Sequence, residues 1–96
     1  MNHDDYLFRL RDRIKNDYKH VWTKRSYWDN PKSPLGEIDI LAQTYKGDLH
    51  IFEVKSKSGK PTAIKQLTRA KKRLSGYMCR TFYYEGRSDR LEELYL

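Results

Sequence analysis

Hydrophobic residues recur along this chain with two different spacings, and each spacing predicts one type of element. A spacing of three and four residues predicts one helix over residues 3–19 and another over residues 62–75. Pro61 suits the start of the second helix and Gly76 suits its end. The apolar stripe of the first helix is Leu7, Leu10, Ile14 and Tyr18, and that of the second is Ala63, Ile64, Leu67, Ala70 and Leu74.

Between and after these helices, apolar and polar residues alternate as they do in strands. The pattern predicts an edge strand over residues 21–28, a loop with two prolines over residues 29–34, and a hairpin formed by residues 37–44 and 49–56. Gly47 suits the positive φ of the tight turn in that hairpin. A further strand is predicted over residues 78–84.

The C-terminal segment contains Asp89 and Glu92 at capping-box spacing, which predicts a short closing helix over residues 89–96. The predicted element order is α-β-β-β-α-β-α. The sequence therefore indicates an α/β fold, with residues 1–96 forming one small domain that has a modest core.

Charged residues interrupt the two apolar strands of the hairpin. By the period of two, Glu37 and Asp39 share one face of the first strand, while Glu53 and Lys55 share one face of the second. The tight turn sets Asp39 beside Glu53, with Lys55 close by. Carboxylates are depleted from buried sheet because a charge there needs a partner or a metal.

Two carboxylates on adjacent strands make an oxygen-ligand site for a hard divalent cation such as Mg²⁺, and the carbonyl of Val54 can add a third ligand. Such a cation polarises a phosphate oxygen and acidifies a water. Lys55 can orient that water or stabilise the charge that builds up on phosphorus. The alternative is a set of cross-strand Glu–Lys contacts on an exposed sheet face.

The composition adds a candidate partner. The 96 residues contain 20 Lys and Arg against 13 Asp and Glu, a net charge of +7, which favours a polyanion such as nucleic acid. A soluble basic surface without a partner is the alternative. Cys79 is the single cysteine, which fits a reducing cytosolic compartment. We expect no membrane span and no secretory signal.

Two short segments resemble the motif of the PD-(D/E)XK nuclease superfamily, the restriction-endonuclease-like fold: Gly36-Glu37-Ile38-Asp39 and Phe52-Glu53-Val54-Lys55-Ser56. They are most similar to the corresponding segments of archaeal Holliday junction resolvases and of a set of small bacterial proteins. The resemblance is specific over about twenty residues. It implies an αβββαβ core with a mixed sheet flanked by helices, and a Mg²⁺- or Mn²⁺-dependent nuclease.

The resemblance also implies roles for three further residues. The superfamily adds an acid in its first helix, and Asp4 is the candidate, although it is shorter than the usual Glu and equally suits a helix N-terminus. Gln66 either braces Lys55 or faces solvent, since the Tyr expected four residues later is Ala70 here. Glu37 is either an outer metal ligand or a partner of Lys55, or simply an exposed strand residue.

The sequence thus predicts a metal-dependent deoxyribonuclease, structure-selective as in junction resolution, that works as a homodimer in the cytoplasm of an archaeal cell or of a virus-infected host. Its rivals are a non-catalytic basic DNA-binding protein on the same scaffold and a protein with an RNA partner. The histidines His3, His20 and His50 lack ligand spacing and are interpreted as structural. The predicted DNA-contacting residues are Lys57, Lys60, Lys65, Arg69, Lys72 and Arg73.

Overall fold

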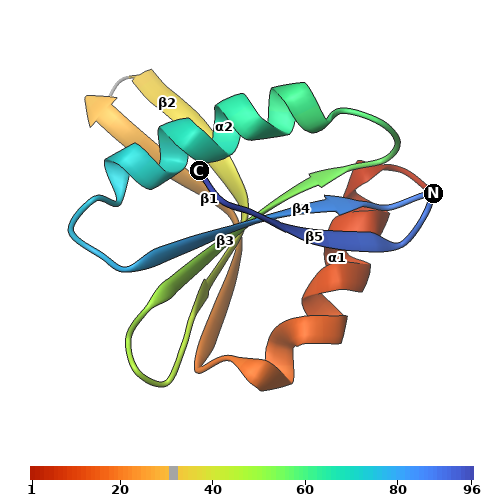
Figure 1. The fold of residues 1–96 in the computed structure, drawn as a ribbon, viewed down its shortest axis with the longest axis horizontal. Helices are drawn as coiled ribbons and strands as arrows, with labels where there is room; N and C mark the ends of the chain where they lie inside the picture. The colour runs from red at the N-terminus through yellow and green to blue at the C-terminus, as the bar shows by residue number, and fades with distance from the viewer. Residues whose placement is uncertain (31–32) are drawn as a thin grey trace.

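Five strands form one mixed sheet with a helix on each face in the computed structural model, which describes residues 1–30 and 33–96, with side chains described outside residues 26–35 (Figure 1). The strand order is β1-β2-β3-β4-β5, and all neighbours are antiparallel except β3 and β4. This confirms the predicted small α/β core. The elements are α1 (His3–Ile14), η1 (Lys15–Asp17), β1 (His20–Asn30), β2 (Ser33–Gln43), β3 (Leu49–Lys55), α2 (Lys60–Arg73), β4 (Cys79–Glu85) and β5 (Arg90–Leu94).

Helix α1 begins at a capping box and covers one face of the sheet. The Asn2 side chain accepts a hydrogen bond from the Asp5 amide, and the Asp5 carboxylate accepts one from the Asn2 amide. Its apolar stripe packs on alternate residues of the central strands. This first core cluster contains Tyr6, Leu7, Leu10, Ile14, Ile40, Ala42, Phe52, Val54 and Tyr84.

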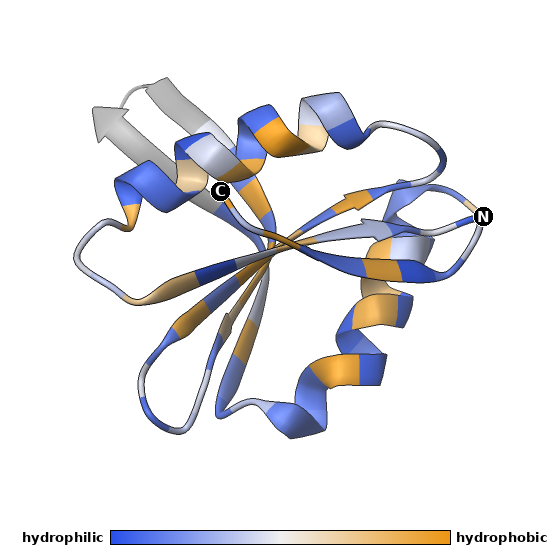
Figure 2. Ribbon diagram, in the orientation of Figure 1, coloured by the Kyte–Doolittle hydropathy of each residue, from blue (hydrophilic) through white to orange (hydrophobic). Residues whose placement is uncertain are grey.

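Helix α2 covers the opposite face with the stripe that the sequence predicts. Ala63, Leu67 and Ala70 are buried there, and Ile64 and Leu74 pack beside them. The second core cluster also takes in Ile38, Leu41, Leu49, Ile51, Tyr83 and Leu94. Hydrophobic residues recur along both helices and along the strands of the sheet (Figure 2). Both faces of the sheet are therefore buried, which makes any charge in β2 or β3 expensive.

The hairpin of β2 and β3 forms at its predicted place. Its turn has Gly47 at φ +99, a conformation that glycine adopts without steric cost. The predicted proline loop at residues 29–34 is wrong at its ends, because β1 continues to Asn30 and β2 begins at Ser33. These residues pair with each other across the β1–β2 ladder, so that the strands run further than the proline content suggests. Pro31 and Lys32 lie outside the described residues.

The predicted C-terminal helix is wrong, because the segment forms strand β5 on the free edge of β4. Leu91 packs against the first core cluster and Leu94 lies in the second, so their spacing of three serves two faces of a strand rather than one face of a helix. Asp89, the expected cap, has φ +54, and its carboxylate instead accepts a hydrogen bond from the Tyr84 hydroxyl.

The two long helices differ from prediction mainly at their ends. Helix α1 stops at Ile14 and is followed by the 3-10 turn η1, so the predicted extension to Lys19 is wrong. Helix α2 runs from Lys60 to Arg73, two residues earlier at each end than predicted. Within the described part of the chain, no helix has the length and apolar character that a membrane span requires.

Candidate active site

The candidate site lies where strand β2 separates from strand β3. The ladder between these strands ends at the pair Ile40 and Phe52, and the next position in register sets Asp39 against Glu53. Beyond that point the Val54 amide donates its hydrogen bond to a side chain of β2 instead of to the backbone of β2. The acceptor is Asp39 Oδ2, at 2.8 Å. The buried carboxylate is therefore fixed in place by the backbone of the neighbouring strand.

The residues on either side of Asp39 in strand β2 face different core clusters, and strand β1 is distorted opposite it at Lys24. Ile38 packs into the second core cluster and Ile40 into the first, so that simple alternation of faces fails across Asp39. Pairing of Thr23 with Ile40 and of Arg25 with Ile38 places Lys24 opposite Asp39. Lys24 has φ +53, which is costly for a lysine and is the kind of local strain found at functional sites.

Glu53 is almost fully buried, with 3% of its surface exposed, on the α2 side of the sheet. The alternative of an exposed sheet face is therefore wrong for this residue. Burial is the largest cause that raises the pKa of Glu53 to about 9, followed by the charge of the adjacent Asp39; Lys55 lowers it partly. Two carboxyl groups this close cannot both ionise cheaply, so the pair retains a proton unless a cation replaces it.

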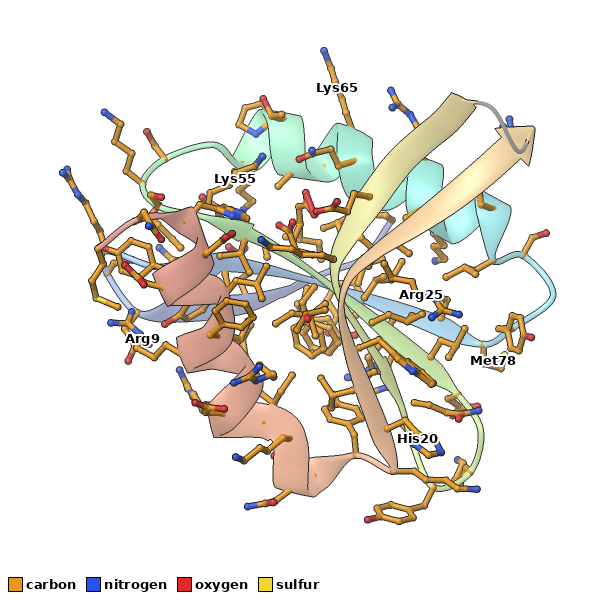
Figure 3. The ribbon with its side chains drawn as sticks, turned by 180° about the vertical axis from the view of Figure 1, so that it is seen from behind. Arg9, His20, Arg25, Lys55, Lys65 and Met78 are labelled. Carbon is orange, nitrogen blue, oxygen red and sulfur yellow. The ribbon has the colours of Figure 1, made fainter. Side chains whose placement is uncertain are left out.

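Lys55 ends strand β3 beside this pair, and its side chain lies near the N-terminal turns of both helices (Figure 3). Its aliphatic stem packs against Gly59, where an added Cβ would come within 3.0 Å of the Lys55 Cγ. Its carbonyl accepts a hydrogen bond from the Gly86 amide at 2.8 Å. The lysine is therefore held at both its backbone and its stem, close enough to Glu53 to act on that carboxyl's pKa.

Two of the other predicted residues behave differently from Asp39 and Glu53. Gln66 on α2 has a buried Oε1 with no hydrogen-bond partner among the described residues, so this oxygen neither faces solvent nor braces Lys55. A buried acceptor without a donor is costly and indicates a missing partner. Glu37 is exposed, two residues before Asp39. The structure thus brings Asp39, Glu53 and Lys55 together and leaves Glu37 at the margin.

His3 lies in the site, although its spacing in the sequence gave no such signal. Its Nε2 donates a hydrogen bond to the Val54 carbonyl at 2.9 Å and lies 3.3 Å from Asp39 Oδ2. Its Nδ1 is 3.4 Å from Oδ1 of Asp4. Only the fold, which sets the start of α1 against the end of β3, reveals this contact between residues 51 positions apart.

Asp4 does not contact Asp39 directly but contacts His3, which does. Its Oδ2 lies 2.6 Å from the Lys24 Nζ, and this hydrogen bond is the main cause that lowers the pKa of Asp4 and raises the pKa of Lys24. Asp4 reaches Asp39 through His3 rather than directly. Lys24 is a further residue of this network that the sequence analysis missed, because its role depends on the distorted backbone of β1.

The donors in the site suit a hard divalent cation. Asp39 and Glu53 offer buried carboxylate oxygens, and the Val54 carbonyl beside them accepts a hydrogen bond from His3. Burial and the charge of Asp39 raise the pKa of Glu53, so a bound cation would stabilise the ionised pair. In the described part of the chain, no three side chains of the His, Cys, Asp or Glu type are already grouped as a metal cage.

Basic side chains extend from the site along the outer face of α2. The exposed residues Lys65, Arg69 and Lys72 recur at helical spacing, and Lys65 projects away from the sheet (Figure 3). Arg73 is exposed at the end of the helix and Lys57 in the loop before it. The Lys60 Nζ lies 2.8 Å from Glu92 Oε1, so part of the charge of Lys60 is neutralised.

The raised pKa of Glu53 predicts the pH dependence of stability in metal-free protein. The folded state holds this proton up to about pH 9, whereas the unfolded chain releases it near its ordinary value of 4.5. The stability that the Glu53 proton contributes is therefore full below about pH 4.5 and is lost as pH rises toward 9, by at most about 1.4 kcal/mol per pH unit. Urea unfolding in EDTA at pH 6 and pH 8.5 measures the loss.

Glu53→Gln is expected to remove most of that loss and to be more stable than wild type at pH 8.5. Glu92→Gln is the matched control, because the Lys60 hydrogen bond lowers the pKa of Glu92 and gives the opposite sign. An unchanged pH slope in Glu53→Gln would show that the buried pair does not hold a proton.

Comparisons with known proteins support the fold. The sequence matches no protein-family model and no curated protein. Among solved structures it is similar to that of the EndoMS–dsDNA2 complex, with a TM-score of 0.54 and 13% sequence identity. The match covers 84% of this chain and 34% of that one, so the chain spans about a third of the length of its structural neighbour. At this identity the likeness shows a shared fold and nothing finer.

Proposed function

We propose that this protein is a divalent-metal-dependent nuclease that hydrolyses phosphodiester bonds of DNA. The observation that carries the proposal is the pair of buried carboxylates, Asp39 and Glu53, set beside Lys55 where β2 leaves β3. A purely structural role does not account for two buried, adjacent acids that must share a proton. The fold of a protein in complex with double-stranded DNA adds support for the substrate.

In this proposal the carboxylates bind the metal and Lys55 acts on the reacting groups. Asp39, Glu53 and the Val54 carbonyl would hold Mg²⁺ or Mn²⁺, which when bound supplies charge to the phosphate and a more acidic water. Asp39 keeps its position because it accepts the Val54 amide hydrogen bond. Lys55, packed against Gly59, presents its ammonium to the attacking water or to the charge that develops on phosphorus.

The basic face of α2 would bind the DNA backbone. Phosphate contacts give affinity and position without reading the sequence. The Lys55 stem packs against Gly59, which precedes α2, so the start of α2 lies close to the carboxylate pair. The basic face of α2 therefore begins near the site. Each chain carries one such site, so cutting both strands of a duplex requires two copies, and we propose a homodimer selective for branched DNA.

Cleavage assays test the proposal directly. Purified protein is incubated with Mg²⁺ or Mn²⁺ on linear duplex, nicked, single-stranded and four-way-junction DNA, and with EDTA as the metal-free control. The expected result is metal-dependent cutting that is fastest on the junction. Asp48→Asn, which changes a carboxylate in the hairpin turn, is the matched control and should cut normally. Salt-sensitive binding without cutting on any substrate would support a DNA-binding protein instead.

DNA binding is expected to be electrostatic and independent of base sequence. If about five phosphates are contacted, the logarithm of the affinity should fall against the logarithm of salt concentration with a slope near −4 to −5. Replacing Lys65, Arg69 and Lys72 together by glutamate should flatten the slope by roughly one for each lost contact. Fluorescence anisotropy in Ca²⁺, which is used to prevent cutting, measures both slopes.

The matched control for this charge reversal is Lys46→Glu, in the exposed hairpin turn at the opposite end of β3 from Lys55. It changes the same net charge per substitution and should leave the slope within error of wild type. If Lys46→Glu flattened the slope as much as each substitution on α2 does, the effect would be one of net charge and not of a surface on α2.

A further inference from the structure

A pocket lies on the α2 side of the sheet, between strands β1, β2 and β3 and the segment that follows α2. Its volume is about 270 Å³, close to the lower end of the range for small-ligand sites, and suits one small molecule rather than a long one. Four aliphatic side chains of the second core cluster and its margin form its apolar part: Ile38, Leu41, Leu49 and Leu74. The proposed nuclease chemistry uses none of these residues.

Flat side chains complete the lining of this pocket. Trp22 belongs to β1, and Tyr77, which is 57% exposed, belongs to the turn after α2. The guanidinium carbon of Arg25 lies 5.8 Å from the centroid of a Trp22 ring, and the His20 ring centroid lies 5.4 Å from that of Trp22. Arg25 itself lines the pocket, on the side of β1 that faces the end of α2 (Figure 3). The pocket therefore contains two aromatic rings and a planar cation.

The pocket shares a face of the sheet with the buried carboxylate Glu53. Leu49 and Glu53 lie four positions apart on this face of β3, which corresponds to about 13 Å at a rise of about 3.3 Å per residue. Ile38, which lines the pocket from β2, directly precedes Asp39. Stacked nucleotides of one strand are about 3.4 Å apart, so the pocket lies roughly four nucleotides from a phosphate bound at the carboxylates.

The chemistry of the lining suits a nucleobase better than an aliphatic side chain. A base has flat faces, which stack on aromatic rings and on guanidinium planes, and polar edges, which need hydrogen-bond partners. Gln43 also lines the pocket, and its side chain carries both an amide donor and a carbonyl acceptor. The cation of Arg25 and the net charge of +7 favour a ligand that carries phosphate.

We propose that this pocket binds the base of an unpaired nucleotide, stacked against Trp22, Arg25 and Tyr77. The inference rests on the proposed function, because it identifies the feature of branched DNA that the protein recognises. A base inside a duplex is already stacked and paired, so a base at a branch, gap or bulge enters the pocket at a lower cost. Stacking accepts every base, and the pocket is therefore compatible with binding that is independent of base sequence.

Anisotropy in Ca²⁺ with two matched DNAs tests the pocket. Both are duplexes with a short single-stranded gap, and they differ only in that the gap of one carries abasic residues, so the number of phosphates is equal. The wild type is expected to bind the gap with bases about 10-fold more tightly than the abasic gap. In Tyr77→Ser and in Trp22→Leu this ratio should fall below about 2-fold, because each variant removes a stacking surface.

Tyr45→Ser is the matched control, because Tyr45 is 75% exposed in the hairpin turn, outside the pocket. It should keep the wild-type ratio. Thermal unfolding checks that the variants fold, and Tyr77→Ser, which changes an exposed side chain, should unfold close to the wild-type temperature.

Equal affinity of the folded wild type for the two DNAs overturns the inference, and the proposed nuclease stands if the protein still cuts DNA with Mg²⁺ or Mn²⁺. A preference for the gap with bases, lost in Tyr77→Ser, supports the pocket even if no substrate is cut, in which case the proposed nuclease fails alone. Light scattering tests the other occupant. If Tyr77→Ser turns a wild-type dimer into a monomer and leaves the affinity ratio unchanged, the pocket holds a second copy of the chain and the inference fails.

Discussion

Replacement of Asp39 by asparagine is expected to abolish divalent-metal binding and to lower the cleavage rate by roughly 10²–10³-fold or more. The fold should survive, because the amide oxygen of asparagine can still accept the Val54 hydrogen bond that the carboxylate accepts at 2.8 Å. What the variant loses is the negative charge opposite Glu53. Calorimetry with Mn²⁺ and initial rates on junction DNA measure the two effects.

The control for this change is Asp48→Asn, which removes a carboxylate of the same size from the hairpin turn. Thermal unfolding of Asp39→Asn should stay close to that of wild type, since the hydrogen bond from the Val54 amide persists. Wild-type Mn²⁺ affinity in a folded Asp39→Asn protein would remove Asp39 from the metal site. A protein that fails to fold would show that the carboxylate is structural, and Asp39→Glu would then separate charge from shape.

The motif hairpin and both helices could be predicted because their signals are local. Helical stripes, the Gly47 turn and the register that sets Asp39 beside Glu53 all depend on residues close in sequence. The burial of Glu53 could not be predicted in this way. It depends on α2 lying over the same face of the sheet, and strand alternation alone does not say whether a face is covered.

The residues that the sequence analysis missed share a physical cause. His3 and Lys24 join the site only because α1 begins beside the end of β3 and because β1 is distorted opposite Asp39. Neither contact has a spacing rule. The wrong C-terminal helix has a related origin, since Leu91 and Leu94 satisfy a helical period locally while the free edge of β4 offers a ladder of backbone hydrogen bonds.

Replacement of Lys55 by methionine is expected to reduce cleavage by roughly 10²–10⁴-fold while DNA affinity and Mn²⁺ affinity change less than about 3-fold. Methionine keeps an unbranched stem against Gly59, so packing survives and only the ammonium is lost. The rate falls because that charge acts on the attacking water or on developing negative charge. Affinity persists because it is spread over many phosphate contacts.

Single-turnover cleavage and anisotropy in Ca²⁺ separate the two quantities for Lys55→Met. Lys57→Met is the matched control, because it removes the same charge two residues later from an exposed position in the loop before α2. Loss of affinity in parallel with rate would make Lys55 a DNA-binding residue. A wild-type rate would exclude Lys55 from the reaction. We expect the slower rate, because the ammonium of Lys55 lies close enough to the buried Glu53 to lower the pKa of that carboxyl group.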